Sequence, residues 1–136
     1  MRFENKIAVL LRDDLAGWQR LNVTAFLVSG LAARRPDLIG KEYADADGRV
    51  YLPMFRQPVL VFQGDAVLLR TAHGRALERE LPMGVFTADL FATGNDEDNR
   101  AAVQRVRTAD LDLVGLVVEG PRNAVDKVLK GATLHG

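Results

Sequence analysis

The sequence predicts a single α/β domain, and three observations support this prediction. Short apolar runs alternate along the chain with segments of helical periodicity, as expected for strands and helices packed in layers. The chain has 136 residues, 48% of them hydrophobic and 26% charged, which suits one globular domain over residues 1–136. No internal repeat, low-complexity stretch or linker divides the chain.

Four buried strands are expected where apolar runs are bounded by charge, glycine or proline. They cover residues 6–12, 58–64, 83–91 and 111–120. Between the first two, "KEYADADGRVYLPM" alternates around Asp47-Gly48, a dipeptide that favours a tight turn. A small exposed β-hairpin or long loop is therefore expected at about 41–54.

Four helices are expected between and after these strands, over residues 18–34, 65–80, 93–107 and 121–131. Asp13 and Asp14 offer N-cap oxygens to the first helix, and Asp65 offers one to the second. The third has acidic residues in its first turn and arginines in its last, which suits the helix dipole. The fourth has proline in its first turn and Gly131 as its C-cap.

The first of these helices is apolar on most sides. One expected face carries Leu21, Ala25, Val28 and Ala32. The apolar surface is widened by Trp18, Phe26, Leu27 and Leu31. A helix that is apolar on most sides is buried on most sides, so we expect this helix to form a homodimer contact as well as a core contact.

Composition and charge exclude several classes of protein. The lack of cysteine excludes disulfides, thiolate metal sites and cysteine nucleophiles, and it fits a cytoplasmic protein. The net charge of zero disfavours nucleic-acid binding, although a local arginine patch stays open. The N-terminal apolar run is short and ends in charge, which does not suit a signal peptide, and no stretch approaches the length of a membrane span.

Common catalytic and metal-binding motifs are also missing. Ser29 is the only serine and lies in mid-helix, and no glycine pattern suited to phosphate follows a strand. His73 and His135 are isolated. "DADG" lacks the glutamate that closes a calcium loop, and the acids of "NDEDNR" are typical of a solvated first helical turn. We therefore expect neither a metal nor a cofactor.

The more informative polar residues follow predicted strands. Asp13 and Asp14 follow the first strand, Asp89 ends the third, and Thr93 comes four residues later. Parallel strands would bring them to one rim, where an aspartate beside a hydroxyl and an arginine can orient water or accept a proton. The alternative is that these residues only cap helices and make turns.

The C-terminal stretch "LVGLVVEGPRNAVDKVLKGATL" resembles the closing segment of the type 2 peptidyl-tRNA hydrolases, where a strand runs into Gly-Pro and a helix with Asp-Lys-Val follows. The matching residues are Gly120, Pro121, Asp126, Lys127, Val128 and Leu134. The whole chain also resembles a bacterial family of uncharacterised proteins in the same superfamily, through "RDDLAGWQRLNV", "LPM" and "LFATG". This resemblance implies a three-layer α/β/α fold on a four-stranded mixed sheet, often as a dimer.

The same resemblance implies an altered active site. Asp14-Leu15 and Gly17 match the hydrolase loop, but the essential lysine falls on Trp18, or on Gln19 if the register shifts by one. Neither side chain replaces an ammonium group.

Other positions are partly kept. Arg20 would stand where the hydrolase has a second lysine, and Thr24 where its helix has a glutamine. Asp89 and Thr93 match the spacing of its catalytic aspartate and threonine. Arg12 or Arg20 could supply positive charge, but an arginine is not equivalent to a lysine.

Three hypotheses follow. In the first, the protein has a peptidyl-tRNA hydrolase-like fold without the catalytic lysine and binds a small anionic ligand at the strand-end rim, near Asp14, Trp18, Arg20, Thr24, Asp89 and Thr93. In the second, it is an active hydrolase of peptidyl-tRNA or a related ester, with Asp89 orienting water and an arginine replacing the lysine, which requires a positive rim. The third is a non-catalytic dimeric interaction module. The neutral charge disfavours tRNA as a partner.

Overall fold

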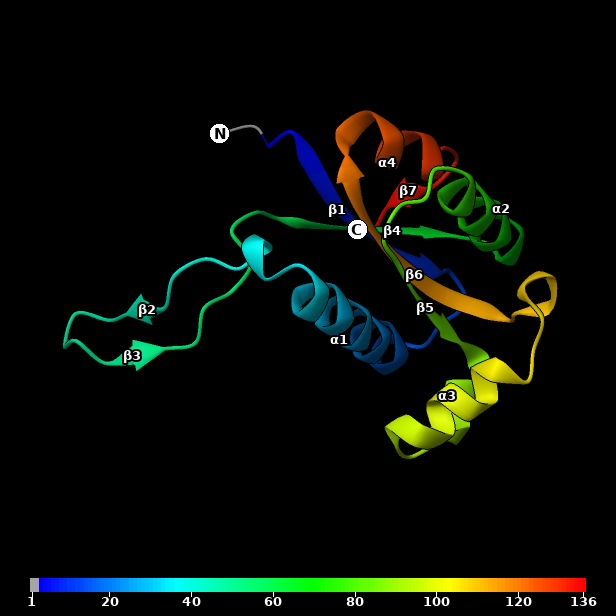
Figure 1. Cartoon of the computed structure of the whole chain (residues 1–136), viewed down its shortest axis with the longest axis horizontal. Coiled ribbons are helices and arrows are strands. Elements are labelled where there is room, and N and C mark those ends of the chain that lie inside the picture. The colour runs from blue at the N-terminus through cyan, green and yellow to red at the C-terminus, as the bar shows by residue number, and fades with distance from the viewer. Residues whose placement is uncertain (1–2) are drawn as a thin grey trace.

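A computed structural model describes residues 3–136 and shows a five-stranded mixed sheet between helices (Figure 1). The strand order is β5-β6-β1-β4-β7. The strands are β1 Asn5–Arg12, β4 Val59–Gly64, β5 Met83–Thr87, β6 Leu113–Pro121 and β7 Thr133–Leu134. β1 and β4 are parallel, and every other neighbouring pair is antiparallel.

Helices cover both faces of the sheet, in agreement with the layered α/β prediction (Figure 1). α1 Gly17–Arg34 covers one face, and α2 Ala66–Glu78 and α4 Arg122–Val128 cover the other. α3 Asp96–Gln104 lies beyond the end of β5. Residues 3–136 also contain three short 3-10 helices, namely η1 Pro36–Leu38, η2 Ala88–Ala92 and η3 Thr108–Asp110.

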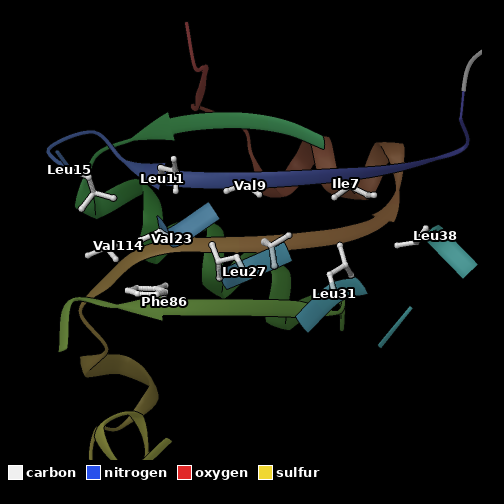
Figure 2. Packing of buried hydrophobic residues seen from close by; sticks show 11 residues of the cluster. Ile7, Val9, Leu11, Leu15, Val23, Leu27, Leu31, Leu38, Phe86 and Val114 are labelled. Carbon is white, nitrogen blue, oxygen red and sulfur yellow. The ribbon is translucent and has the colours of Figure 1, made fainter. Parts of the chain in front are cut away.

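The core has two halves because successive side chains of a strand point to opposite faces. Figure 2 shows the half under α1, where side chains of β1 and α1 meet. Its labelled members from these two elements are Ile7, Val9, Leu11, Val23, Leu27 and Leu31. Ala8 and Leu10 point to the other half, under α2 and α4.

The prediction that α1 is buried on most sides is wrong for the single chain. The structure buries Val23, Leu27 and Leu31, whereas Leu21 is 76% exposed. The buried side packs closely on β6, where a Cβ on Gly115 would come within 2.6 Å of Val23 Cγ1. Gly115 thus leaves room for Val23 at this contact.

The four-stranded sheet that the resemblance implied is not what the structure has. The fifth strand, β7, consists of two residues paired with β4, and the backbone of His135 extends this pairing by donating to the Val61 carbonyl oxygen at 2.8 Å. Two residues are too few to show an alternating pattern in sequence.

Of the two structures expected at about 41–54, a β-hairpin or a long loop, the protein has the hairpin. It is formed by β2 Tyr43–Ala44 and β3 Val50–Tyr51. Its turn uses Gly48 at a φ of 81°, a conformation that glycine adopts without steric cost. In Figure 1 this hairpin stands away from the rest of the molecule, beyond the C-terminal end of α1.

Several predicted boundaries and caps need correction. The strand predicted over 83–91 ends at Thr87, where its pairing with β6 becomes irregular and the chain turns into η2. The third helix ends at Gln104, before the arginines expected in its last turn. The last helix ends at Val128, and Gly131, at a φ of 101°, belongs to the turn that leads into β7.

Of the predicted N-caps, only Asp65 is confirmed. Its carboxylate accepts a hydrogen bond from the Leu68 amide at 2.8 Å. The prediction for Asp13 and Asp14 is wrong, since α1 starts after Ala16, whose amide donates to the Gln19 side chain at 2.9 Å.

Within residues 3–136, none of the helices combines the length and hydropathy that crossing a bilayer requires.

Candidate ligand pocket at the strand ends

Three strand ends meet at one edge of the sheet. β1 and β4 run in parallel, and β5 shares their direction because both β5 and β1 are antiparallel to β6. The segments that follow β1 and β5 therefore start at the same edge. This topology is the one that the sequence analysis assumed when it expected the residues after these strands to lie at one rim.

An ion-pair network occupies the centre of this rim. The Arg12 guanidinium donates to Asp14 Oδ1 at 2.7 Å and to Asp112 Oδ1 at 2.9 Å. The hydrogen bond from Arg12 lowers the pKa of the exposed Asp14 carboxyl group. This network ties the end of β1 to the start of β6. The carboxylates of Asp14 and Asp112 offset the positive charge of Arg12.

Arg20 also has structural partners. It donates to the backbone oxygens of Asp13 at 2.6 Å and Leu15 at 2.9 Å. It also donates to Gln63 Oε1 at 3.1 Å and contacts His135 Nε2 at 2.8 Å. Its guanidinium thus fixes the β1–α1 loop against β4 and the C-terminal segment.

Thr24 lies one turn after Arg20 on α1. Its hydroxyl group donates to the Arg20 carbonyl oxygen at 2.8 Å. This is a common bond of helical threonines.

Trp18 lies two residues before Arg20, so it points to another side of α1 and lines a pocket of about 290 Å³. The pocket lies between the first half of α1 and the segment from η2 to α3. Its lining residues are Trp18, Asn22, Phe26, Phe86, Leu90, Phe91, Thr93, Gly94, Asn95, Asp96 and Asn99.

Four aromatic side chains form one wall of this pocket. The Trp18 ring meets Phe91 edge-on at 5.9 Å between centroids. Phe91 lies 5.2 Å from Phe86, which meets Phe26 edge-on at 6.1 Å. Such packing fixes the rings relative to one another and gives the pocket an apolar aromatic wall.

Polar groups from η2 to α3 form the opposite rim. The Thr93 hydroxyl group lies within hydrogen-bond distance of the Leu90 carbonyl oxygen and the Asn99 side-chain oxygen. Asn95 caps α3 by accepting from the Asp98 amide at 2.9 Å, and Asp96 pairs with Arg100. The bond to Thr93 engages the Asn99 oxygen, so its NH₂ group is the part that can face a ligand.

The chain matches the family described as "Protein of unknown function (DUF2000)" over residues 5–136. It belongs to the DUF2000 family. A solved structure of a protein of unknown function from Agrobacterium tumefaciens strain C58 has 44% sequence identity and a TM-score of 0.96, with 99% of this chain and 100% of that chain covered. Comparison with the curated proteins gave no match. The family description and the structure bear on neither ligand nor catalysis, so the likeness to peptidyl-tRNA hydrolases stays a proposal.

The DUF2000 pocket includes only part of the predicted site. Trp18 and Thr93 line it together. Asp14, Arg20 and Thr24 do not line it and make the structural contacts described above.

Asp89 lies in η2 with an exposed side chain, and within residues 3–136 no hydrogen bond or ion pair involves its carboxylate. Thr93 therefore lines the pocket and Asp89 does not, although their spacing matches that of the catalytic pair in the hydrolases that the chain resembles.

The sequence prediction missed the pocket's amide groups. Asn22 and Phe26 follow Trp18 at intervals of four residues, so the three share one face of α1. Extending that face from Trp18 would have found them. Asn99 had no comparable signal, because only the fold of η2 against α3 brings it to Thr93.

No group of three or more histidine, aspartate or glutamate side chains in the described part of the chain lies close enough together to hold a metal ion.

Proposed function

We propose that this DUF2000 protein binds a small molecule in the aromatic pocket between α1 and the η2–α3 segment. The ligand would place an apolar or aromatic group against the wall that Trp18 and Phe91 form. It would hydrogen-bond through polar substituents to the amides of Asn22 and Asn99. The observation that carries this proposal is a pocket with an aromatic wall, a polar rim and an exposed tryptophan at the edge where three strands end.

The size of the pocket limits the ligand. A volume of about 290 Å³ is at the small end of ligand sites in proteins, which run from ~300 to 1,000 Å³. A mono- or bicyclic heteroaromatic compound fits this size and the mixture of aromatic and amide groups.

The charges favour an uncharged ligand over the anionic one expected from the sequence. Arg12 is paired with two carboxylates, and Arg20 is held by backbone oxygens and Gln63. Among residues 3–136, the pocket lining holds no lysine or arginine, and its acidic side chain, Asp96, pairs with Arg100. We therefore propose that recognition depends on ring stacking and hydrogen bonds rather than on charge pairing.

The contacts of Trp18 and Gln19 support an altered site relative to the peptidyl-tRNA hydrolases that the chain resembles. Trp18 packs on Phe91, and the Gln19 side chain caps α1. At both positions where the resemblance puts the lysine, the side chain therefore has a structural contact of its own. We propose that the protein is not a peptidyl-tRNA hydrolase.

The only tryptophan of the chain, Trp18, makes the pocket directly observable. Titration of heteroaromatic fragments, read by Trp18 fluorescence, should give a saturable change for part of a fragment set. Asn99→Ala should weaken the affinity of those fragments about fivefold to tenfold, because it removes roughly 1 kcal/mol of hydrogen bonding.

The matched control is Asn123→Ala, which removes an exposed asparagine near the start of α4, outside the pocket lining. It should bind the same fragments as the parent. No saturable change with any fragment, or equal loss of affinity in both variants, would contradict the proposal.

We also propose a homodimer and a cytoplasmic location. The homodimer is supported by large apolar side chains that the single chain leaves exposed on α1, namely Trp18, Leu21 and Phe26. The cytoplasmic location is supported by the absence of cysteine from the sequence.

A further inference from the structure

The hairpin at residues 41–54, which we call the arm, has no packing partner in the single chain. Every residue from 41 to 52 is exposed. Large apolar side chains lie along the arm, and Leu52 is the most exposed of them at 83%. The others are Tyr43, Val50, Tyr51 and Met54. An isolated two-stranded hairpin is marginally stable in water, so this one needs a surface to pack against.

The arm is nevertheless well organised. Backbone pairing joins Tyr43 to Tyr51, and the Asp45 carboxylate accepts from the Asp47 and Arg49 amides, both at 3.0 Å. The Tyr51 hydroxyl group donates to the same carboxylate at 2.7 Å and lowers the Asp45 pKa. A preformed arm loses little conformational entropy when it docks.

The base of the arm is closed. The Gly40 amide donates to the Met54 carbonyl oxygen, and the Arg56 amide donates to that of Leu38, both at 2.9 Å. Phe55 packs into the core beside Leu38. The arm therefore projects in a fixed direction, beyond the C-terminal end of α1 (Figure 1).

We propose that the arm docks along α1 of a second copy of this chain, so that two copies exchange arms across a two-fold axis. This inference takes up the homodimer proposed above and names the segment that makes it. The axis would pass near residues 35–40, between α1 and the arm. Each arm then lies over the exposed Trp18, Leu21 and Phe26 side of the other copy's α1, next to the ligand pocket that Trp18 and Phe26 line, and forms that pocket's outer side.

Dimensions support this arrangement. Each side of the arm has about seven residues and is ~23 Å long. The 18 residues of α1 make a helix ~27 Å long. The arm therefore covers most of one side of that helix.

The exposed apolar area is also sufficient. The eight large side chains named above on the arm and on α1 expose roughly 800 Å², which is one partner's share of a standard stable interface. In a two-fold dimer each copy buries both its own arm and its own α1 surface. The exposed areas of the arm and of α1 are therefore added to give the area that one copy contributes.

Charge does not oppose the pairing. α1 has no acidic residue, and its two arginines, Arg20 and Arg34, lie on other sides of the helix than Trp18. Residues 41–49 carry three acidic and two basic residues, so docking does not bring like charges together.

The test compares three exposed apolar residues, each changed to aspartate. The variants are Leu52→Asp on the arm, Leu21→Asp on α1 and Val67→Asp at the start of α2, on the other face of the sheet. Sedimentation equilibrium should show a dimer for the parent and for Val67→Asp. The dimer dissociation constant of the other two should rise at least 100-fold, since each change occurs twice per dimer.

A cross-linking experiment identifies the contact between copies. Because the chain has no cysteine, Leu52→Cys and Leu21→Cys variants can be mixed and treated with a short bismaleimide. The mixture should give a covalent Leu52→Cys to Leu21→Cys product, and a mixture with Val67→Cys in place of Leu21→Cys should give none.

The outcomes separate the two proposals. A monomeric parent would overturn both the homodimer and the arm exchange. A dimer that persists in Leu52→Asp, without the cross-link to Leu21→Cys, would overturn the arm exchange and leave the homodimer standing. Dissociation by both acidic substitutions on the proposed interface, together with that cross-link, supports the arm exchange.

Discussion

Individual side chains at the strand-end rim show why residue type alone is a weak guide to chemistry. Arg12 and Arg20 have the chemistry of anion-binding residues, yet each is held by groups of its own fold. Trp18, which suited a ligand pocket as well as it suited a core or interface, lines the pocket and is 63% exposed. What a side chain can offer a ligand depends on which donors the fold leaves unengaged.

A buried histidine makes stability depend on pH. His73 lies in α2 and is 7% exposed, and desolvation lowers its pKa below the ordinary 6.5. The folded state therefore binds fewer protons than the unfolded state just below pH 6.5. The contribution of the neutral His73 to the free energy of unfolding is fully present above pH 6.5. It decreases as the pH drops toward the pKa of His73 in the folded state.

Urea unfolding at pH 7.5 and pH 5.5 checks this expectation. The parent should lose free energy of unfolding at the lower pH, and His73→Leu should lose less. This window lies above the range in which Asp14 and Asp37 titrate, so their lowered pKa values do not contribute. Equal losses in parent and variant would rule out His73 as the cause.

At the level of elements, glycines decide how closely helices approach the sheet. Gly115 in β6 lies under α1, where an added Cβ would meet Val23 Cγ1 at 2.6 Å and Leu27 Cδ1 at 3.2 Å. Gly74 in α2 has open space around the same position, with nothing within 4 Å. The two glycines therefore have opposite expected responses to alanine.

Gly115→Ala should destabilise the protein by about 2 kcal/mol, because the added methyl group overpacks the α1–β6 contact. Gly74→Ala should stabilise it by roughly 0.5–1 kcal/mol, because alanine is the better helix former. Chemical denaturation of both variants checks the pair. A stabilising Gly115→Ala would show that α1 does not pack on β6 as closely as described.

At the scale of the whole molecule, the charge around the rim bears on the hydrolase alternative. That alternative requires a positive face, but in the segments at this edge carboxylates outnumber arginines. The arginines are Arg12, Arg20, Arg100, Arg105 and Arg107, and the acidic residues are Asp13, Asp14, Asp65, Asp89, Asp96, Glu97, Asp98, Asp110 and Asp112. Phosphate backbones bind through unpaired cations, and this edge is rich in carboxylates instead.

Purified protein should therefore release no N-blocked amino acid from tRNA. The assay is run beside an Asp89→Asn variant, which removes the carboxylate that the hydrolase alternative uses to orient water. Turnover in the parent that disappears in the variant would overturn our proposal and establish catalysis without the lysine.

The sequence by itself determined the layered α/β class, the exposed hairpin and the Asp65 cap. Apolar periodicity, the Asp47-Gly48 turn and the short cap motif are local patterns, and each selects one local structure. It also predicted a site at the edge of the sheet where strands end, because apolar runs followed by polar residues can be recognised in the sequence alone.

Only the tertiary structure decided the fifth strand, the buried side of α1 and the composition of the pocket. β7 exists because β4 offers a free edge, and Val23 packs closely on β6 because Gly115 leaves room for it. Asn99 reaches Thr93 because α3 folds back on η2. These features depend on contacts between residues that are distant in sequence or joined by irregular turns, and local patterns carry no information about such contacts.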